Sequence, residues 1–227
     1  MADYKAIVTG GAKGIGHAIT SALLKAGGKV CFLDVSVSEG EKAQKSFDEK
    51  YGSGKAVFLK CDVSKKDELR DVFHRAKTQM GGLNVVCNNA GVAFYEDEGT
   101  HSDEIISINL GGIINGSMLA LELMGRGYGG NGGVIINMSS VAGVKKSLVV
   151  PIYSATKAGV VHYSRCIAQS SSQDHGVRVN CVCPVAVYTD MVARLLNNTW
   201  DGTFKPPQEL ADYLPKTHEA AREMYSK

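Results

Sequence analysis

The stretch KAIVTGGAKGIGHAITSALLKAGGKVCFLD, residues 5 to 34, decides the fold class of this chain. A short β-branched run, residues 5 to 9, breaks into glycines and is followed by an alanine- and leucine-bearing segment that ends at Gly27-Gly28. A second apolar run then closes on Asp34. This order predicts a strand, a helix and a second strand parallel to the first. We therefore expect an α/β fold.

The glycine turn between the first predicted strand and the helix has the composition of a phosphate-binding loop. Gly10, Gly14 and Gly16 give the spacing G-x-x-x-G-x-G instead of the commoner G-x-G-x-x-G. Glycines let the backbone approach a pyrophosphate closely, and a helix N-terminus favours its negative charge. The alternative for this motif alone is a plain tight turn. The strand before it and the helix after it favour phosphate binding.

Asp34, at the end of the second strand, bears on the choice of nucleotide. A carboxylate at this place can accept hydrogen bonds from the adenosine ribose hydroxyls and repels a 2′-phosphate, which favours NAD over NADP. Lys13, inside the glycine turn, could approach a 2′-phosphate and favours the opposite choice. We give Asp34 more weight because Val35 and Ser36 offer no cation beside it. The structural alternative for Asp34 is a helix or turn cap.

The rest of the chain repeats the alternation of apolar strands and amphipathic helices. Leu69, Val72, Phe73 and Ala76 form the kind of apolar stripe by which a helix packs on a sheet. Repeats of about 25 residues imply right-handed crossovers and a doubly wound parallel sheet with helices on both faces. The predicted strands cover residues 5–9, 29–34, 55–60, 83–89, 133–138 and 177–184, and the later predicted helices cover 36–51, 64–80, 104–124 and a segment that ends near 171.

The chain is long enough, at 227 residues, for one domain with a sizeable core. Within a single domain, 1–227, we expect 1–92 to be mainly the nucleotide-binding half and 93–184 the catalytic half. The irregular segment 185–227 is expected to supply a substrate lid and the C-terminal segment, since long irregular segments beside a cleft are often lids. We interpret the glycine-rich residues 125–133 as a flexible connection only.

Residues 137 to 159, NMSSVAGVKKSLVVPIYSATKAG, carry the candidate catalytic groups. Tyr153 and Lys157 lie four residues apart, so on a helix a phenol and an ammonium share a face and can point into one cleft. A fixed positive charge favours the phenolate and lowers the pKa of a tyrosine from its ordinary value of about 10. Ser140 would lie where the preceding strand ends, the edge at which ligands bind in such sheets. Tyr-x-x-x-Lys alone also occurs by chance in many helices.

Polar positions on other elements add to this group. Asn109 lies inside a predicted helix, where asparagine is a poor helix former and a purely structural helix has little reason to place it. Asp62 follows the strand at 55–60 and either caps the next helix or hydrogen-bonds an adenine edge. A further strand leads into the small, amide-rich run NNAG, residues 88–91.

The composition argues against several other classes of function. The formal net charge is only +2 and no basic block exceeds two residues, so nucleic acid binding has no support. No apolar run approaches the roughly 18 residues of a membrane helix, and residues 1–11 lack the layout of a signal peptide. We therefore expect no membrane span and a cytoplasmic location.

The cysteines and histidines do not suggest a metal site. The six cysteines are scattered, mostly in strand-like runs, which favours free buried thiols in a reducing compartment. We expect Cys181 and Cys183 to point to opposite faces of the last strand and therefore not to share a metal ion. The six histidines show no metal-binding spacing, so we predict no metal.

Together these motifs resemble the short-chain dehydrogenase/reductase family over nearly the whole chain. The detailed sequence is most similar to the NAD-linked 15-hydroxyprostaglandin dehydrogenase branch, with insect alcohol dehydrogenase-like relatives nearby. Seven motifs in the family's order and spacing carry far more weight than any one of them. The matching motifs are TGGAKGIG (9–16), Asp34, CDV (61–63), NNAG (88–91), Asn109 in ISINL, Ser140 in NMSSVAG and Tyr153-x-x-x-Lys157.

The resemblance implies an NAD-dependent oxidoreductase for a small-molecule secondary alcohol or ketone, hydrophobic or lipid-derived. It assigns Tyr153 as the general base and Ser140 as the group that holds the substrate oxygen. Lys157 would lower the tyrosine pKa and bind the nicotinamide ribose, and Asn109 would hold a water in a proton path. Family members usually form homodimers or homotetramers through the helices that carry Asn109 and Tyr153. The implied cofactor-binding residues are Gly10, Lys13, Gly14, Ile15, Gly16, Asp34, Asp62, Val63, Asn89, Ala90, Gly91, Tyr153, Lys157, Val187 and Thr189.

The sequence departs from the family pattern in three places. Pro184-Val185 replaces the usual Pro-Gly after the sixth strand, and valine cannot adopt glycine conformations. Val150 stands where the prostaglandin branch carries glutamine, which argues against prostaglandin specificity. The sequence stops at Lys227, before the family's last strand, so we expect a sheet without that strand and with an exposed edge. The alternative is therefore a catalytically impaired, nucleotide-binding homologue that acts as a binding or interaction protein.

Overall fold

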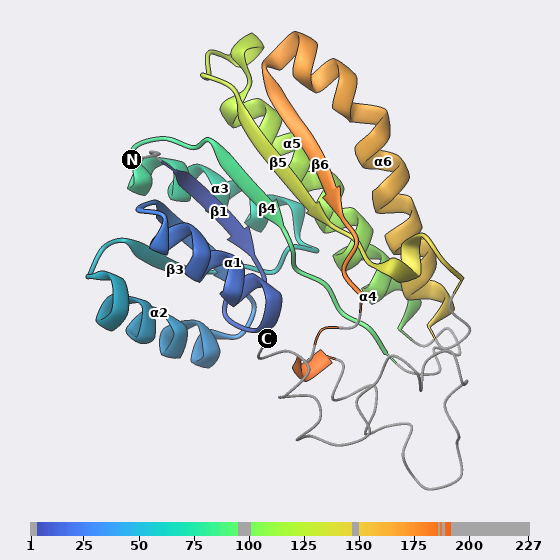
Figure 1. Ribbon diagram of the computed structural model, residues 1–227, viewed down its shortest axis with the longest axis horizontal. Helices are drawn as coiled ribbons and strands as arrows, with labels where there is room; N and C mark the ends of the chain where they lie inside the picture. The colour runs from blue at the N-terminus through green and yellow to red at the C-terminus, as the bar shows by residue number, and fades with distance from the viewer. Residues whose placement is uncertain (1–3, 95–100, 147–149, 186, 188, 192–227) are drawn as a thin grey trace, which may run out of the picture.

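The computed structural model describes residues 4–94, 101–146, 150–185, 187 and 189–191. These residues form a parallel sheet of six strands in the order β3-β2-β1-β4-β5-β6 (Figure 1). The predicted α/β class and doubly wound parallel sheet are confirmed. The strands are β1 (Lys5–Thr9), β2 (Lys29–Asp34), β3 (Ala56–Lys60), β4 (Val85–Asn88), β5 (Gly133–Met138) and β6 (Val177–Val182).

Helices connect these strands. A π-helical turn, Ser107–Gly111, lies between α4 and α5, and short 3-10 turns cover Arg126–Tyr128 and Val141–Gly143. The α-helices are α1 (Gly14–Lys25), α2 (Val37–Tyr51), α3 (Lys66–Met80), α4 (Ser102–Ile106), α5 (Gly112–Met124) and α6 (Pro151–His175).

The strand order determines where a ligand can bind. The chain builds β1, β2 and β3 outward in one direction and then returns, so that β4 pairs with the other side of β1. Connections on the two sides of this point leave in opposite directions, which opens a crevice at the carboxyl ends of β1 and β4. The glycine turn and residues 88–91 follow these two strand ends, and Ser140 follows the next strand, β5.

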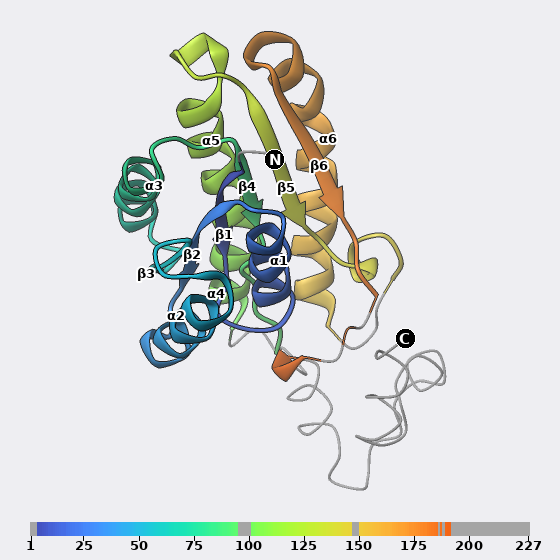
Figure 2. The same ribbon diagram turned by 60° about the vertical axis from the view of Figure 1, so that its left-hand side comes forward.

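Apolar layers cover both faces of the sheet. On one face, α3 and α5 pack on sheet residues that include Ile7, Leu33 and Val86, all fully buried. On the other face, α1 and α2 pack on Val30 and Phe32. Figure 2 shows α1 on the near side of the sheet and α5 and α6 on the far side. The helices thus hold the strand ends in place from both sides.

The local sequence explains the helices, as α3 illustrates. Its predicted apolar stripe, with Leu69 and Phe73, is buried against the sheet. Asp67 and Glu68 occupy the first turn, where the helix dipole favours negative charge. Gly81 ends the helix in the left-handed conformation at φ 68°, which glycine adopts without strain.

Two predicted helices differ from the structure. The helix expected over 104–124 begins at Ser102 and is interrupted by the π turn that carries Asn109, so a continuous α-helix was wrong. A π turn inserts one extra residue into the helix and is often found at functional sites. The helix expected to end near 171 continues to His175, because Gly176 at φ 65° supplies the left-handed cap.

The glycine-rich residues 125–133 are more than a flexible connection. Gly130 N donates a hydrogen bond to Gly125 O at 2.9 Å, and Gly132 N donates to Met124 O at 2.7 Å. Tyr128 stacks on His175, with ring centroids 5.1 Å apart. The segment therefore has a defined path against the end of α6.

Two predictions lie outside the described residues. One is the prediction that 185–227 supplies a lid and the C-terminal segment, since most of this range is not described. The other is the prediction that the sheet lacks the family's last strand. Within the part of the chain that the structure describes, β6 pairs on one side only, with β5.

One helical stretch, Ser102–Met124, is long and apolar enough to cross a membrane by length and composition, which the expectation from the sequence overlooked. Core helices of soluble proteins pass the same test. Ile105, Ile113 and Leu119 of this stretch are buried within the protein. The stretch is therefore weak support for a membrane span, and the predicted absence of a span stays a prediction.

Candidate active site

The glycine turn has a shape that larger residues cannot adopt. Gly10 and Gly14 have left-handed φ values of 64° and 53°. A Cβ on Gly16 would lie 2.0 Å from Gly10 O and 2.6 Å from Asn89 Nδ2. The first backbone N–H groups of α1, which begins in this turn, have no partners within the helix and suit a pyrophosphate. Ile15 is half-buried in the first turn of α1.

Residues 89–91 connect the glycine turn to the candidate catalytic groups. Asn89 N and Ala90 N both donate to Thr9 Oγ1, at 2.9 and 3.0 Å. At the other end, a Cβ on Gly91 would lie 3.1 Å from Asn109 Oδ1 and 3.4 Å from Lys157 Nζ. The nucleotide turn and the catalytic groups therefore share one continuous wall.

Asp34 lies beside the glycine turn, as predicted from its place after β2. Its two carboxylate oxygens accept hydrogen bonds from Ala12 N and Ser36 N, both at 3.1 Å. Asp34 therefore caps backbone N–H groups, as the structural alternative predicts. Each carboxylate oxygen has further lone pairs, and the side chain is partly exposed. Asp34 can therefore still accept hydrogen bonds from ribose hydroxyls. These residues fit a dinucleotide whose adenosine ribose carries free hydroxyls.

Lys13 is paired with carboxylates in this structure. Its Nζ lies 2.9 Å from Asp190 Oδ2 and 3.4 Å from Glu39 Oε1. The hydrogen bond to Asp190 holds the pKa of Lys13 above its ordinary value. Thr189 lies beside the same turn, since a Cβ on Gly14 would meet Thr189 Cγ2 at 3.2 Å. Lys13 therefore joins the segment after β6 to the turn, which weakens its assignment to a 2′-phosphate.

Asp62 and Val63, which follow β3, have different partners in the structure. Asp62 Oδ1 accepts hydrogen bonds from Ser64 N at 3.0 Å and from Ser64 Oγ at 2.7 Å. Burial acts to raise the pKa of Asp62, but the hydrogen bonds from Ser64 together with the charges of Lys65 and Lys60 hold this pKa below its ordinary value. Val63 is 7% exposed and packs against Gly112. Asp62 thus serves the turn before α3, and the Val63 side chain belongs to the core.

Lys157 is held at the end of β5. Its Nζ donates to Met138 O at 2.9 Å and lies 5.5 Å from the centre of the Tyr153 ring. The residue is 3% exposed. Burial lowers the pKa of the Lys157 ammonium to about 8, against an opposing effect of Cys181 and Cys183. The structure therefore brings the ammonium close to the phenol ring, while their joint role in catalysis stays a prediction.

Tyr153 and Ser140 meet in this cleft. Burial raises the pKa of the Tyr153 phenol, and a hydrogen bond with Ser140 lowers it by less. The phenol on its own is therefore a poorer acid than free tyrosine in this structure. The expectation that Lys157 lowers this pKa stays a prediction. Ser140 Oγ also accepts a hydrogen bond from Ala142 N at 3.2 Å, which orients the hydroxyl at the strand end.

Asn109 fixes the loop that enters the cleft. Its Oδ1 accepts from Val92 N and its Nδ2 donates to Val92 O, both at 2.8 Å. The same Nδ2 lies 3.5 Å from Thr156 Oγ1, which donates to Tyr153 O at 2.7 Å. The side chain of Asn109 thus bridges the loop after β4 and the helix that carries Tyr153.

The remaining predicted positions follow β6 or precede α6. Val187 is 37% exposed, and Val185, which replaces the family's glycine, is 52% exposed. Pro184 O accepts a hydrogen bond from Val141 N at 2.9 Å, so this segment runs beside the residue that follows Ser140. Val150, 9% exposed, immediately precedes α6.

The expectation that Cys181 and Cys183 face opposite ways was wrong, because residues two apart in a strand share a face. The two thiols interact with each other, and both affect the pKa of Lys157. Among the residues that the structure describes, no group of three or more His, Cys, Asp or Glu side chains could hold a metal ion.

Burial of Lys157 predicts a pH-dependent difference between the wild type and Lys157→Met. The Lys157 pKa falls from 10.5 to about 8 on folding, so between these values the unfolded chain holds a proton that the folded protein has released. The charged form therefore costs stability below pH 8, and the cost disappears as the pH rises through this window. We expect the wild type to gain about 3 kcal/mol in unfolding free energy relative to Lys157→Met across the window.

Urea unfolding of both proteins at several pH values measures this difference. Contributions of groups that both proteins share cancel in the comparison. A difference that stays constant across the window would show that burial does not lower the Lys157 pKa.

Comparisons with known proteins agree with this geometry. A family model described as short chain dehydrogenase matches residues 4–200. The 15-hydroxyprostaglandin dehydrogenase (NAD(+)) of Rattus norvegicus is 38% identical over 188 residues, which cover 82% of this chain and 69% of the relative. The Homo sapiens protein of the same name is 38% identical over 185 residues, 81% of this chain and 68% of the relative. The 3-oxoacyl-(acyl-carrier-protein) reductase FabG of Chlamydia muridarum (strain MoPn / Nigg) is 32% identical over 223 residues, 93% of this chain and 88% of the relative.

Proposed function

The chain belongs to the short chain dehydrogenase family, and we propose that it is an NAD-dependent oxidoreductase that interconverts a hydrophobic secondary alcohol and its ketone. Family membership supports the oxidoreductase class. The observation that carries the finer proposal is the convergence of Ser140, Tyr153 and Lys157 at the end of β5, beside the glycine turn. A pure binding protein has no need of this combination.

NAD is the proposed cofactor. Two of the relatives carry NAD(+) in their names. The glycine turn offers backbone N–H groups for the pyrophosphate, and Asp34 offers carboxylate oxygens for the ribose. Bound NAD supplies the acceptor for the hydride that leaves the carbinol carbon. The chain's own residues then have to bind the alcohol, orient it and move its proton.

Tyr153 is the proposed general base in the oxidation direction. Its phenolate takes the proton of the substrate hydroxyl. At the same time the carbon–hydrogen bond of the carbon that bears this hydroxyl breaks, and its hydride passes to NAD. Ser140 shares a hydrogen bond with the phenol, so a substrate oxygen between them would be held by both. In the reduction direction the same phenol returns the proton to the new hydroxyl.

Lys157 and Asn109 support this proton transfer. A protonated Lys157 favours the Tyr153 phenolate, because its Nζ lies 5.5 Å from the ring centre in a poorly solvated cleft. The pKa of about 8 leaves most of the ammonium charged at neutral pH. We propose that Asn109 lines the path by which the proton reaches solvent and holds a water there. It bridges the loop after β4 and the helix of Tyr153.

Exposed apolar side chains favour a hydrophobic substrate. Val144, a few residues after Ser140, is 66% exposed, and Val185 and Val187, which follow β6, are 52% and 37% exposed. Exposed apolar groups near a site often mark the surface that contacts a ligand. The relatives' names include a hydroxyprostaglandin and a 3-oxoacyl group, that is, a hydroxyl in one and an oxo group in the other. We propose a substrate of this general kind.

A substrate panel tests the proposal. Hydrophobic secondary alcohols of different size are incubated with NAD, and NADH formation is followed by its absorbance. Turnover of at least one alcohol, abolished by omission of NAD, is the expected result. Calorimetric binding of NAD without turnover across the panel would favour the alternative, a catalytically impaired homologue that binds nucleotide.

Asp34 predicts the choice between the two dinucleotides. We expect NAD to bind at least about tenfold more tightly than NADP, a difference of about 1.4 kcal/mol. Asp34→Asn removes the charge that repels a 2′-phosphate and should reduce this preference to less than about threefold. Calorimetric titration of both cofactors into both proteins measures it.

Lys13→Gln serves as the control for Asp34→Asn. Because Lys13 already pairs with Asp190 and Glu39, we expect its loss to leave the preference for NAD unchanged. Equal affinities of the wild type for the two dinucleotides would contradict the role of Asp34.

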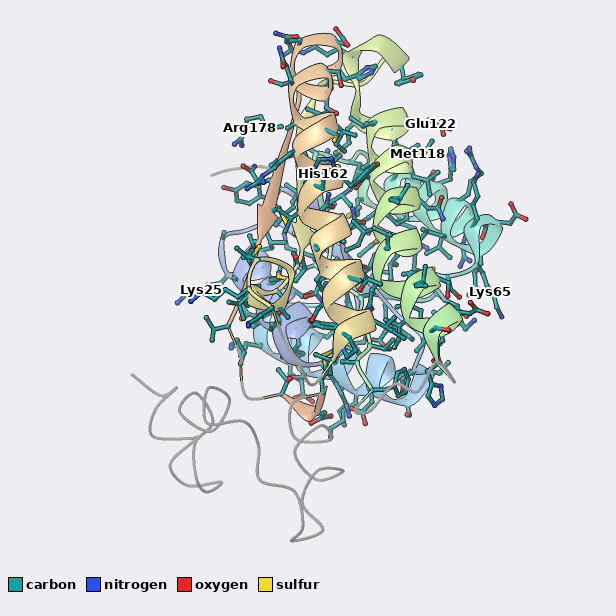
Figure 3. The ribbon with its side chains drawn as sticks, turned by 90° about the vertical axis from the view of Figure 1, so that its right-hand side faces the viewer. Lys25, Lys65, Met118, Glu122, His162 and Arg178 are labelled. Atoms are coloured by element: carbon teal, nitrogen blue, oxygen red, sulfur yellow. The ribbon has the colours of Figure 1, made fainter. Side chains whose placement is uncertain are left out.

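We propose that the protein is a cytoplasmic homo-oligomer that pairs through α5 and α6. These helices lie side by side on the face seen in Figure 3, where Met118 and Glu122 come from α5 and His162 from α6. Met118 is 57% exposed, so the outer face of α5 presents an apolar side chain that a second copy of the chain could cover. Sedimentation velocity of the full chain measures the mass, and a monomer at all concentrations would reject the assembly.

A further inference from the structure

Ser139, next to the proposed catalytic Ser140, is buried against α6. Ser139 is 3% exposed, whereas Ser140 is partly exposed. The Ser139 Oγ donates a hydrogen bond of 2.7 Å to the backbone oxygen of Lys157, inside α6. The Ser139 N donates to Val182 O at 2.8 Å. One residue therefore joins the end of β5 to both β6 and α6.

The contacts of Ser139 complete a clamp around Lys157. The Lys157 side chain is held by Met138 O, the residue before Ser139, at 2.9 Å. The Lys157 backbone is held by Ser139 Oγ, and Gly143 packs on the same carbonyl, where a Cβ would lie 2.7 Å from the oxygen. Met138, the last residue of β5, and Ser139, which follows it, thus hold the side chain and the backbone of one lysine.

This clamp determines where the ammonium lies relative to the phenol. A lysine side chain is long and flexible, so its Nζ stays in one place only if its backbone and its charged end are both held. Tyr153 lies one helical turn before Lys157, on the same face of α6. A small retreat of this turn from β5 would lengthen the 5.5 Å separation between Nζ and the Tyr153 ring.

We propose that Ser139 is a positioning residue for the reaction, which acts by holding the Lys157 backbone so that the ammonium stays beside Tyr153. The inference rests on the function proposed above for Tyr153 and Lys157. The Ser139 hydroxyl is bonded to the Lys157 backbone oxygen and is 3% exposed, so we assign it no contact with the substrate. Its hydroxyl acts through the helix, in contrast to Ser140, whose hydroxyl meets the phenol in the cleft.

The molecule offers a matched control for a merely structural role. Ser164 is also 3% exposed and also ties β5 to α6, since its Oγ accepts a hydrogen bond from Asn137 Nδ2 at 3.0 Å. It lies seven residues after Lys157, about two turns along the same helix. Ser164→Ala therefore removes a buried contact between the same strand and helix without touching the clamp.

The experiment compares Ser139→Ala and Ser139→Cys with Ser164→Ala and the wild type. Cysteine has nearly the volume of serine and is a weak donor, so Ser139→Cys tests the same bond if Ser139→Ala does not fold. Thermal unfolding, the affinity for NAD by calorimetry, and the pH dependence of kcat are measured for each protein. Both alanine variants should lose thermal stability to a similar degree.

Only the Ser139 variants should change the chemistry. With a less well placed ammonium the Tyr153 phenolate is less favoured, so the pKa of Tyr153 should rise and the kcat profile should move to higher pH. We expect kcat at neutral pH to fall by about tenfold in Ser139→Ala, a part of what acid–base catalysis contributes. The profile of Ser164→Ala should coincide with that of the wild type.

A readout without turnover separates this inference from the proposed function. The phenolate absorbance of Tyr153, taken as the difference between each protein and its Tyr153→Phe form without NAD, gives the tyrosine pKa directly. A higher pKa in the Ser139 variants supports the proposal even if no alcohol in the panel is turned over. Unchanged Tyr153 titrations in the Ser139 variants, or equal shifts in Ser164→Ala, would overturn it.

Discussion

Replacing Tyr153 by phenylalanine should lower the rate of alcohol-dependent NADH formation by at least about 1,000-fold. The phenol is the proposed group that takes the substrate proton, and it meets Ser140 in the cleft. The ring itself remains in the variant, so the packing around α6 should be kept. Steady-state kinetics with the best alcohol of the panel gives the loss.

Tyr163→Phe is the matched control for this substitution. Tyr163 lies on the same helix, but its hydroxyl contacts Ile114 O, at 3.4 Å, and Ser117, both on α5. We expect its removal to change kcat by less than about threefold, because these partners have no part in the proposed proton transfer. The affinity for NAD and the thermal unfolding of both variants should stay close to those of the wild type. A Tyr153→Phe enzyme with more than about a tenth of the wild-type rate would refute Tyr153 as the base.

The fold could be predicted from the sequence because its signals are local. An apolar run followed by glycines and an amphipathic segment specifies strand, turn and helix within residues 5 to 34, and the same alternation repeats along the chain. Right-handed crossovers then leave few arrangements of a parallel sheet. The predicted stripe of α3, with Leu69 and Phe73, is buried for this reason.

The strand ends also identified the regions of the candidate site. Polar and small residues that follow parallel strands gather at one edge of the sheet, whatever the details of packing. The glycine turn, Asp34 and residues 89–91 lie together as expected. The pattern could not predict which of two adjacent polar residues makes which contact. Ser139 hydrogen-bonds the backbone of α6, whereas Ser140 hydrogen-bonds the Tyr153 phenol.

Long-range contacts account for the predictions that failed or remained open. Lys13 is paired with Asp190, which is 177 residues away in the sequence, and no local pattern indicates such a partner. The π turn at Asn109 allows its side chain to hydrogen-bond the backbone of Val92, a contact that a continuous helical pattern does not suggest. The pKa of Tyr153 depends on burial, which is set by the whole fold.

Gly16→Ala should lower the affinity for NAD by at least about 100-fold, or about 2.8 kcal/mol. The added Cβ would lie 2.0 Å from Gly10 O and 2.8 Å from Gly10 C, and backbone atoms of a tight turn cannot move aside as a flexible side chain can. Either the turn opens or α1 shifts away from it. Both outcomes separate the N–H groups at the start of α1 from the place of the pyrophosphate. Calorimetric titration with NAD measures the loss.

Gly111→Ala separates this steric effect from the general effect of adding a methyl group to a helical glycine. Gly111 also lies in a helical segment without a left-handed φ, and a Cβ there would have only Ile106 O nearby, at an ordinary 3.7 Å. Since alanine is the better helix former, Gly111→Ala should keep the affinity for NAD and the thermal stability of the wild type. The sheet should survive in Gly16→Ala, because the overlap lies at the strand end and not within the core; circular dichroism tests this. An affinity for NAD within about threefold of the wild type would mean that the turn does not cradle the pyrophosphate, and the placement of the dinucleotide would have to be abandoned with it.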